Sequence, residues 1–170
     1  MLFETFYPDN EIKSAYNIPY EELYAKGYRG VLFDVDNTLV PHDAPADKKA
    51  KRLFKRLREI GFETVLISNN RESRVKPFAN EVDSRYIYKA NKPSRTGYNK
   101  AMQMINTTPK TTVFVGDQLF TDVWGAKRAG IMTYLSRPIH PKEEIQIVIK
   151  RRLEAIVLHF YHKKIGKRNG

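Results

Sequence analysis

Short apolar runs alternate with longer amphipathic stretches along most of the chain. Five of these runs predict strands, at 30–36, 62–70, 85–90, 111–117 and 131–136. The apolar parts of three runs, GVLF, TVLI and TVFV, are continuous rather than alternating. Continuous hydrophobicity of this kind indicates strands that are buried on both faces of a parallel sheet.

The segments between these runs have helical spacing of their apolar residues. In 47–61 the inward positions are Ala50, Leu53, Phe54, Leu57 and Ile60, and Gly61 stands where the helix should end. Further helices are predicted at 72–82, at 94–106 with Ser94 as its cap, and at 121–130. Strands separated by helix-length segments predict an α/β fold of three Rossmann-like layers, with a mainly parallel five-stranded sheet and helices on both faces.

The length of 170 residues suits one domain. We expect its core at about 28–140. The segment 1–27 should pack on one edge, with a short helix near 20–27, and 141–170 should form a basic helix followed by a frayed end.

Composition excludes several kinds of site and leaves one global feature to explain. The chain has no Cys, which rules out disulfides, cysteine zinc sites and thiol nucleophiles and fits a cytoplasmic location. We see neither a secretory signal pattern nor an apolar run long enough to span a membrane, so we expect neither. The net charge of +11 attracts polyanions such as anionic lipid, phosphorylated molecules or nucleic acid, or it serves solubility alone.

Polar side chains stand at the carboxyl ends of four of the predicted strands, within the last residues or just beyond them. These are Asp34, Asp36 and Thr38 at the first, Ser68, Asn69 and Asn70 at the second, Lys92 at the third, and Asp117 and Asp122 at the fourth. In open parallel sheets, ligands bind beyond the carboxyl ends of the strands. The sequence therefore predicts that carboxylates, a hydroxyl and an amine meet in one crevice.

Several carboxylates in one crevice stay ionised together only if a cation offsets their repulsion. With no Cys and four His, an oxygen-liganded ion is the natural candidate, and we predict Mg²⁺. A Mg²⁺ ion held by few carboxylates keeps positions that substrate phosphate oxygens usually fill. The combination points to phosphoryl transfer.

The motifs DVDNTL, ISN, NKP and GDQLFTD resemble, in this order, the four signatures of the haloacid dehalogenase (HAD) superfamily. The matched region spans roughly 30–136. Within the superfamily the chain is most similar to YqeG-type phosphatases of subclass III, which are related to phosphatidylglycerophosphate phosphatases. Asn37 stands where the superfamily usually has Gly, a departure that is common in the YqeG-type subgroup.

The resemblance implies a role for each motif residue. Asp34 would be the nucleophile that forms a phospho-aspartate, and Asp36 would be the general acid and then the base. Asp34, the backbone carbonyl of Asp36, and Asp117 would hold Mg²⁺. Asp122 would be a further ligand or would orient the others, unless it only caps the helix that follows.

The same resemblance implies that Ser68, Asn69 and Lys92 contact the transferring phosphoryl group, together with Thr38, which would also fix the turn after the first strand. Many members of the superfamily insert a lid domain after the first or the second motif. Here only about ten residues separate Thr38 from the first helix, and 70–92 has room for one helix and one strand. We therefore expect no large cap and an open site, covered by a small flap at 38–45, in which His42 either reaches the site or stays at the surface.

An open site suits bulky, macromolecular or membrane-bound phosphates. The tail carries Ile145, Val148, Ile149, Ile156 and Phe160 among many Lys and Arg, which is typical of a helix on an anionic membrane surface or of a last helix packed on the sheet. Three functions stay open. The chain is a phosphatase of a bulky or lipid phosphate such as phosphatidylglycerophosphate, a phosphatase of a soluble sugar or nucleotide phosphate, or a basic RNA- or ribosome-associated protein with a vestigial site.

Overall fold

A computed structural model describes residues 3–139 and 145–168, without the side chains of 145–148 and 168. The part of the predicted tail at 141–144 and the last two residues lie outside the described residues. No helix in the described part of the chain is long and apolar enough to cross a membrane.

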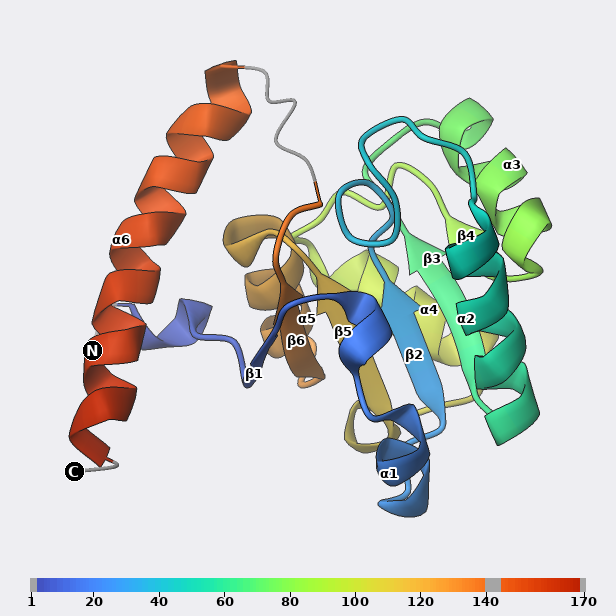
Figure 1. Cartoon of the computed structure of the whole chain (residues 1–170), viewed down its shortest axis with the longest axis horizontal. Coiled ribbons are helices and arrows are strands. Elements are labelled where there is room, and N and C mark those ends of the chain that lie inside the picture. The colour runs from blue at the N-terminus through green and yellow to red at the C-terminus, as the bar shows by residue number, and fades with distance from the viewer. Residues whose placement is uncertain (1–2, 140–144, 169–170) are drawn as a thin grey trace.

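The centre of the fold is a parallel sheet with the strand order β1-β6-β5-β2-β3-β4 (Figure 1). Its strands are β1 (Asn10–Ile12), β2 (Gly30–Phe33), β3 (Glu63–Ile67), β4 (Arg85–Ile87), β5 (Thr112–Gly116) and β6 (Met132–Ser136). All five predicted strands are present, but the prediction of a five-stranded sheet was wrong by one edge strand, β1. This strand has three residues, two of them polar, and it exists through pairing with β6, more than 120 residues away.

Helices cover both faces of the sheet, as predicted. One face packs against α1 (Tyr20–Ala25), α2 (Lys48–Ile60) and α3 (Glu72–Val82), and the other against α4 (Arg95–Met104) and α5 (Trp124–Arg128). Short turns of helix lie at η1 (Glu4–Phe6), η2 (Ala15–Asn17), η3 (Pro109–Thr111) and η4 (Leu119–Val123). Strands β2 and β5 are buried along their whole length, which explains their continuous hydrophobicity.

The predicted helix ends are confirmed where a cap residue marked them. Gly61 ends α2 with a left-handed φ of 116°, and its N–H bonds to the Leu57 carbonyl. The Ser94 hydroxyl accepts a hydrogen bond from the Thr96 N–H at the start of α4. Neither 38–47 nor 70–91 holds an inserted lid domain.

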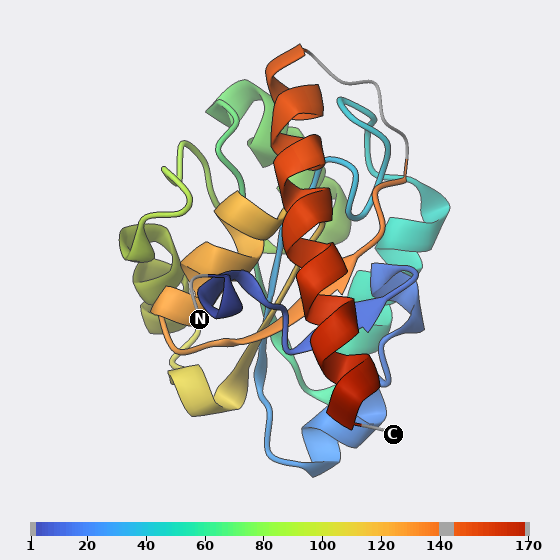
Figure 2. The ribbon, with the colours of Figure 1, turned by 90° about the vertical axis from the view of Figure 1, so that its left-hand side faces the viewer.

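The last helix, α6 (Ile145–Arg168), runs along the edge formed by β6 and β1 (Figure 2). Its buried side chain Val157 packs with Leu119, Val123 and Leu135, and Tyr161 lies 5.0 Å from Tyr7, centroid to centroid. The predicted basic helix is continuous through the described residues Ile145–Arg168, so the fraying expected after it does not begin before Arg168. Hydrophobic and aromatic contacts thus attach α6 and the N-terminal segment to the same edge.

Candidate active site

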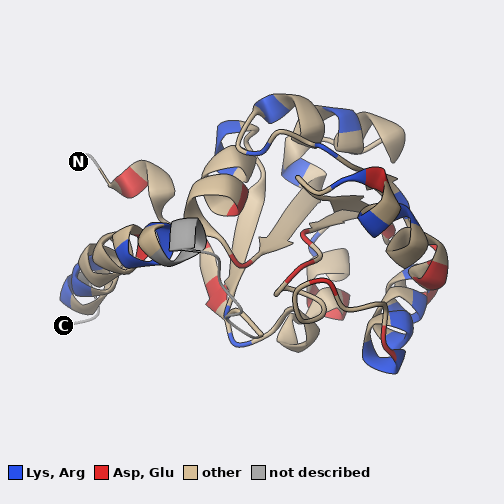
Figure 3. Cartoon of the chain, turned by 90° about the horizontal axis from the view of Figure 1, so that it is seen from above, with Lys and Arg blue, Asp and Glu red and all other residues tan. Residues whose placement is uncertain are grey.

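The register of three neighbouring strands brings the motif residues to one edge of the sheet. Phe33, the last residue of β2, pairs with Val115 of β5 on one side and with Leu66 of β3 on the other. Asp34 therefore stands beside the end of β5, which leads to Asp117, and its N–H bonds to the Val115 carbonyl at 2.9 Å. Seen from above, acidic segments gather in the loops at this edge, whereas basic segments run along α6 (Figure 3).

Three buried carboxylates form the centre of the site. Oxygens of Asp34, Asp117 and Asp122 all lie within 4.8 Å of one another. The Lys92 ammonium is buried between them and donates to Asp34 Oδ1 at 2.7 Å and to Asp122 Oδ1 at 2.6 Å. The Thr38 hydroxyl lies 3.2 Å from Asp34 Oδ2 and 3.3 Å from Asp117 Oδ1. Residues that follow three of the five predicted strands thus come together as a hydrogen-bonded cluster.

Asp122 is held at both of its carboxylate oxygens. Oδ2 accepts the backbone N–H groups of Asp117 and Gln118 at 3.2 and 3.1 Å, and Oδ1 accepts Lys92. A side chain at Gly116 would collide with this carboxylate, because its Cβ would lie 2.5 Å from Asp122 Oδ2. The Asp122 carboxylate therefore fixes the loop that carries Asp117 and orients the Lys92 ammonium.

The ionisation of the cluster reflects burial opposed by ion pairs. Burial, opposed by Lys92, raises the pKa of the Asp34 carboxyl, and burial together with Asp122 raises the pKa of Asp117 against the effect of Arg151. Burial alone would lower the pKa of Lys92, but the Asp122 and Asp34 carboxylates outweigh it and raise that pKa. The lysine is therefore charged, and the carboxylates retain an unfavourable excess of negative charge.

This excess is what a divalent cation would relieve. Three buried carboxylates face one another with oxygen ligands only, which is the donor chemistry that Mg²⁺ prefers. Both oxygens of Asp122 accept the Lys92 ammonium or backbone N–H groups, whereas Asp34 Oδ2 and Asp117 Oδ1 share the neutral Thr38 hydroxyl at 3.2 and 3.3 Å. Asp34 and Asp117 are therefore the side chains best disposed to hold the ion. The residues present fit a divalent metal.

Of the four residues predicted to contact phosphate, three line a cavity and Thr38 does not. A cavity of about 360 Å³ opens beside the cluster, and Asp34, Ser68, Asn69 and Lys92 are among its lining residues. The side chain of Asn69 exchanges two hydrogen bonds with the Lys92 backbone, at 2.7 and 3.1 Å, and so connects the second and third motifs. Thr38 is buried outside this lining and touches the carboxylates instead.

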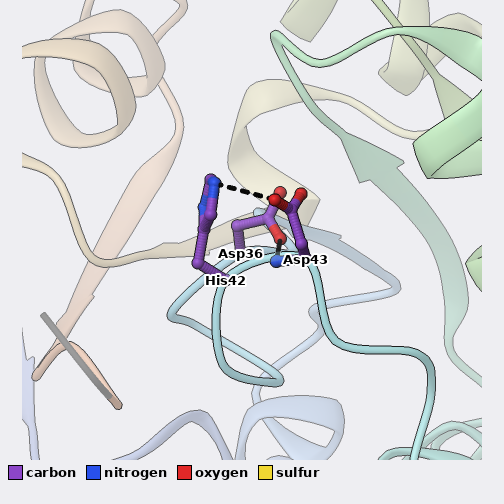
Figure 4. A group of neighbouring side chains, drawn as sticks. All are labelled: Asp36, His42 and Asp43. Atoms are coloured by element: carbon purple, nitrogen blue, oxygen red, sulfur yellow. Dashed lines mark hydrogen bonds and ion pairs between the residues drawn. The ribbon is translucent and has the colours of Figure 1, made fainter. Parts of the chain in front are cut away.

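Asp36 lies in the loop that follows β2, beside the side chains of His42 and Asp43 (Figure 4). Its Oδ1 accepts the Asp43 N–H at 2.9 Å and the Arg74 guanidinium at 2.8 Å. His42 lines the cavity and lies 3.3 Å from the Asp43 carboxylate, so the structure brings it to the site rather than leaving it apart. Asn37 has a φ of 61°, a left-handed conformation that Asn tolerates better than most residues, which explains its place where Gly is usual.

Sequence reasoning missed three residues that hold the site together. Arg74 of α3 contacts Asp36. From α6, Arg151 donates to the Asp117 carbonyl at 2.8 Å and to Asp117 Oδ2 at 2.5 Å. One helical turn later, Glu154 Oε1 accepts the N–H groups of Leu119 and Phe120, and burial raises the pKa of Glu154 to about 7.

Comparison with known proteins agrees with this geometry. Residues 42–130 match the family model of haloacid dehalogenase-like hydrolases. The chain is 34% identical to the "Probable phosphatase YqeG" of Bacillus subtilis over 165 residues, which covers 96% of each chain. It is 29% identical to the chloroplastic and mitochondrial phosphatidylglycerophosphate phosphatase 1 of Arabidopsis thaliana, covering 92% of this chain and 48% of that protein.

Among solved structures, the fold is similar to the cobalt-bound deoxy-D-mannose-octulosonate 8-phosphate phosphatase of Haemophilus influenzae. The TM-score is 0.51 at 13% identity, over 66% of this chain and 80% of that one. A likeness at this identity supports the fold alone, whereas the YqeG relative is alike along nearly its whole length. The chain therefore belongs to the haloacid dehalogenase-like hydrolases and is a phosphatase of that family.

Proposed function

We propose that this phosphatase is a Mg²⁺-dependent phosphomonoester hydrolase that works through a phospho-aspartate on Asp34. The observation that carries the proposal is the Asp34 carboxylate, which borders an open cavity while Lys92, Thr38 and two further carboxylates surround it. A carboxylate in this position is the kind of nucleophile that aspartyl-phosphate enzymes use.

In the first step, an Asp34 oxygen attacks phosphorus and the bond between phosphorus and the alcohol oxygen breaks. Asp36 gives its proton to the departing alcohol. In the second step, Asp36 takes a proton from water, whose oxygen attacks phosphorus and releases Asp34 and inorganic phosphate. The hydrogen bonds that the described residues make to the Asp36 carboxylate all go to Oδ1, an arrangement that favours proton transfer through Oδ2.

The remaining motif residues bind and orient the reacting groups. Asp34, Asp117 and the Asp36 carbonyl would hold Mg²⁺, which when bound would offset the negative charge of the carboxylates and the phosphoryl group. Ser68, Asn69 and Lys92 would contact the phosphoryl oxygens, since all three line the cavity. Thr38 would keep the Asp34 and Asp117 carboxylates in place, and Asp122 would orient Lys92.

We further propose that the substrate is a bulky or lipid phosphate, with phosphatidylglycerophosphate as the leading candidate. The similarity to a phosphatidylglycerophosphate phosphatase supports this choice. The short flap leaves the cavity without a lid domain, which favours substrates that are large or presented at a surface.

The outer face of α6 supports peripheral contact with an anionic membrane. Four of its apolar side chains, which we call the outer stripe, are each at least 45% exposed: Ile149, Leu153, Ile156 and Phe160. Basic residues beside the stripe, such as Arg152 and Lys163, are exposed as well. Apolar residues flanked by positive charge are typical of helices that lie on anionic bilayers. The side chains of Ile145 and Val148, which we also expected on this face, lie outside the described residues.

Hydrolysis of para-nitrophenyl phosphate tests the reaction. The wild type should release phosphate with Mg²⁺ and stop when a chelator is added, and Asp34→Asn should be inactive. Asp83→Asn is the matched control, because Asp83 is an exposed carboxylate at the end of α3. A Mg²⁺-independent reaction, or one that survives Asp34→Asn, contradicts the mechanism.

Vesicles then test the substrate and the membrane contact. Phosphatidylglycerophosphate in vesicles should be hydrolysed faster than soluble sugar and nucleotide phosphates; the opposite order favours a soluble substrate. Vesicles of phosphatidylglycerol should sediment the wild type, and the double variant Leu153→Ser/Ile156→Ser should stay in solution. The control is Tyr88→Ser/Ile139→Ser, which removes two exposed apolar side chains elsewhere.

A further inference from the structure

A second cavity of about 420 Å³ lies between α6 and the sheet edge formed by β1 and β6. We call it the edge groove. It is separate from the cavity beside Asp34, but Asp117 lines it together with Arg151, which also lines the cavity beside Asp34. The ion pair between these two side chains, at 2.5 Å, therefore forms a shared wall with the active site.

Ser136 gives this groove an unused hydrogen-bonding group. It is the last residue of β6, at the carboxyl edge of the sheet, and it is 2% exposed. Among the buried side-chain oxygens and nitrogens of the described residues, the Ser136 hydroxyl stands out because it has no hydrogen-bond partner. Buried polar groups are nearly always paired, so a lone hydroxyl that lines a cavity calls for a ligand.

The charges around the groove favour an anion. The three acidic lining residues are already engaged: Glu11 with His162 at 2.6 Å, Asp117 with Arg151, and Glu154 with Arg151 at 3.5 Å and with the Leu119 N–H at 2.9 Å. The exposed side chains of Lys13 and Arg137 add positive charge along the same lining. An anionic group would therefore be attracted to the end of the groove that Ser136 and Arg137 share.

Apart from Glu154, the rest of the lining is apolar. Ile12 of β1 and Leu135 of β6 form part of one wall, and Leu158 of α6 forms part of the other. A small sugar phosphate would leave these side chains unused. A molecule with one negative charge joined to an apolar chain would use both parts of the groove.

We propose that the edge groove binds a phosphodiester joined to an apolar chain, as in the headgroup region of an anionic glycerolipid. The inference deepens the proposed function and rests on it for the link to the substrate, since the ligand corresponds to the alcohol part of a lipid phosphate. Ser136 and Arg137 bind the phosphodiester, and the apolar chain lies along α6. The groove selects the substrate, whereas the cluster around Asp34 performs the chemistry.

Calorimetric titration of the full chain with dihexanoyl phosphatidylglycerol, kept below its micellar concentration, tests this site. Ala155, an exposed groove residue of α6, allows the groove to be filled, so Ala155→Trp should abolish binding. Ser136→Ala should raise Kd about threefold to tenfold, because it removes one hydrogen bond. The control is Gln103→Trp, which adds a Trp side chain on the exposed side of α4, outside the lining of the groove, and should bind as the wild type does.

Two further ligands separate the contributions of charge and chain. Dihexanoyl phosphatidylcholine, which is zwitterionic, and glycerol 3-phosphate, which lacks the chain, should each bind at least about fivefold more weakly. If either ligand binds as tightly as dihexanoyl phosphatidylglycerol, the groove does not recognise an anionic amphiphile. If Ala155→Trp binds as tightly as Gln103→Trp, the lipid does not bind in the groove. Titration does not depend on turnover. If the wild type binds the lipid but does not hydrolyse para-nitrophenyl phosphate, the proposed phosphatase mechanism is contradicted and the proposed lipid site in the groove is not.

Discussion

The carboxyl edge of the sheet and the helix α6 are built in opposite ways. At the sheet edge, buried charged groups hold one another: Lys92 contacts two carboxylates, and a third is fixed by Arg151. Along α6, a few buried side chains attach the helix, while its outer stripe is exposed to solvent. The charged groups at the sheet edge are held in fixed positions, whereas α6 presents an apolar surface to solvent.

This difference agrees with the two proposals, in which the residues at the sheet edge perform the reaction and α6 selects the substrate. Catalysis requires groups that are held before the substrate arrives, which the hydrogen bonds around Asp34 provide. Since no lid domain is inserted beside the site, α6 is the element that contacts Asp117 from outside the motifs and also faces solvent with apolar side chains. The following substitutions test that division, ordered by their expected effect on catalysis.

Lys92→Met should have the largest effect of these four substitutions, because it removes the positive charge shared by Asp34 and Asp122. We expect activity on para-nitrophenyl phosphate to fall about a thousandfold. Two buried carboxylates would lose their partner, so unfolding in urea should show a loss of about 3–5 kcal/mol. Lys100→Met, on the exposed face of α4, is the control. Activity near that of the control would show that the buried ammonium is dispensable.

Asp36→Asn should reduce turnover about a hundredfold, because an amide neither protonates the alcohol nor activates water. In this variant, hydrolysis of the phospho-aspartate should be slower than its formation. Phosphate should therefore accumulate on the protein, where borohydride reduction and mass spectrometry locate it at Asp34. Asp43→Asn, in the same loop but held through its backbone N–H, is the comparison. Absence of trapped phosphate in both variants would argue against a phospho-aspartate.

Arg151→Gln tests the contact between the two regions. The side chain holds Asp117 at its carboxylate and its carbonyl, so its loss should loosen a proposed metal ligand. We expect the Mg²⁺ concentration for half-maximal activity to rise about tenfold, while activity at saturating Mg²⁺ stays within a few-fold. Direct Mn²⁺ binding, followed by paramagnetic resonance, should weaken in parallel. Arg152→Gln, on the neighbouring exposed residue, should change neither.

Much of the sheet could be predicted because its strands carry local signals. Continuous apolar runs, Gly61 and Ser94 fixed β2, β3, β5 and the ends of two helices with information from a few neighbouring residues. Strand β1 has no such signal. Its side chains are partly exposed, and it becomes a strand only because β6 offers its edge.

The same contrast applies to the candidate site. Asp34, Lys92 and Asp117 could be predicted to meet, because each follows a strand of one parallel sheet. Arg74 and Arg151 could not, because a single arginine on an amphipathic helix has the same local pattern whether it faces solvent or a carboxylate. Their partners are set by how α3 and α6 pack, which depends on contacts between distant parts of the chain.

Glu154→Gln should have the smallest effect on catalysis and should instead change how stability depends on pH. Burial raises the pKa of Glu154 from 4.5 to about 7, so the folded protein binds this proton more tightly than the unfolded chain does. The corresponding stability is fully present below pH 4.5 and is lost as the pH rises through 7, a decline of up to about 3 kcal/mol. The amide keeps an oxygen for the Leu119 N–H but does not ionise.

Urea unfolding of the wild type and of Glu154→Gln between pH 5 and pH 8 measures this difference. Asp34 and Asp117, whose pKa values are also raised, contribute a decline to both proteins, so the difference between the two curves isolates Glu154. The wild type should lose more stability than the variant over this range, with Lys163→Gln, an exposed substitution on the same helix, following the wild type. Parallel curves would mean that Glu154 keeps an ordinary pKa and that α6 holds the loop at Leu119 through a carboxylate charged throughout this range.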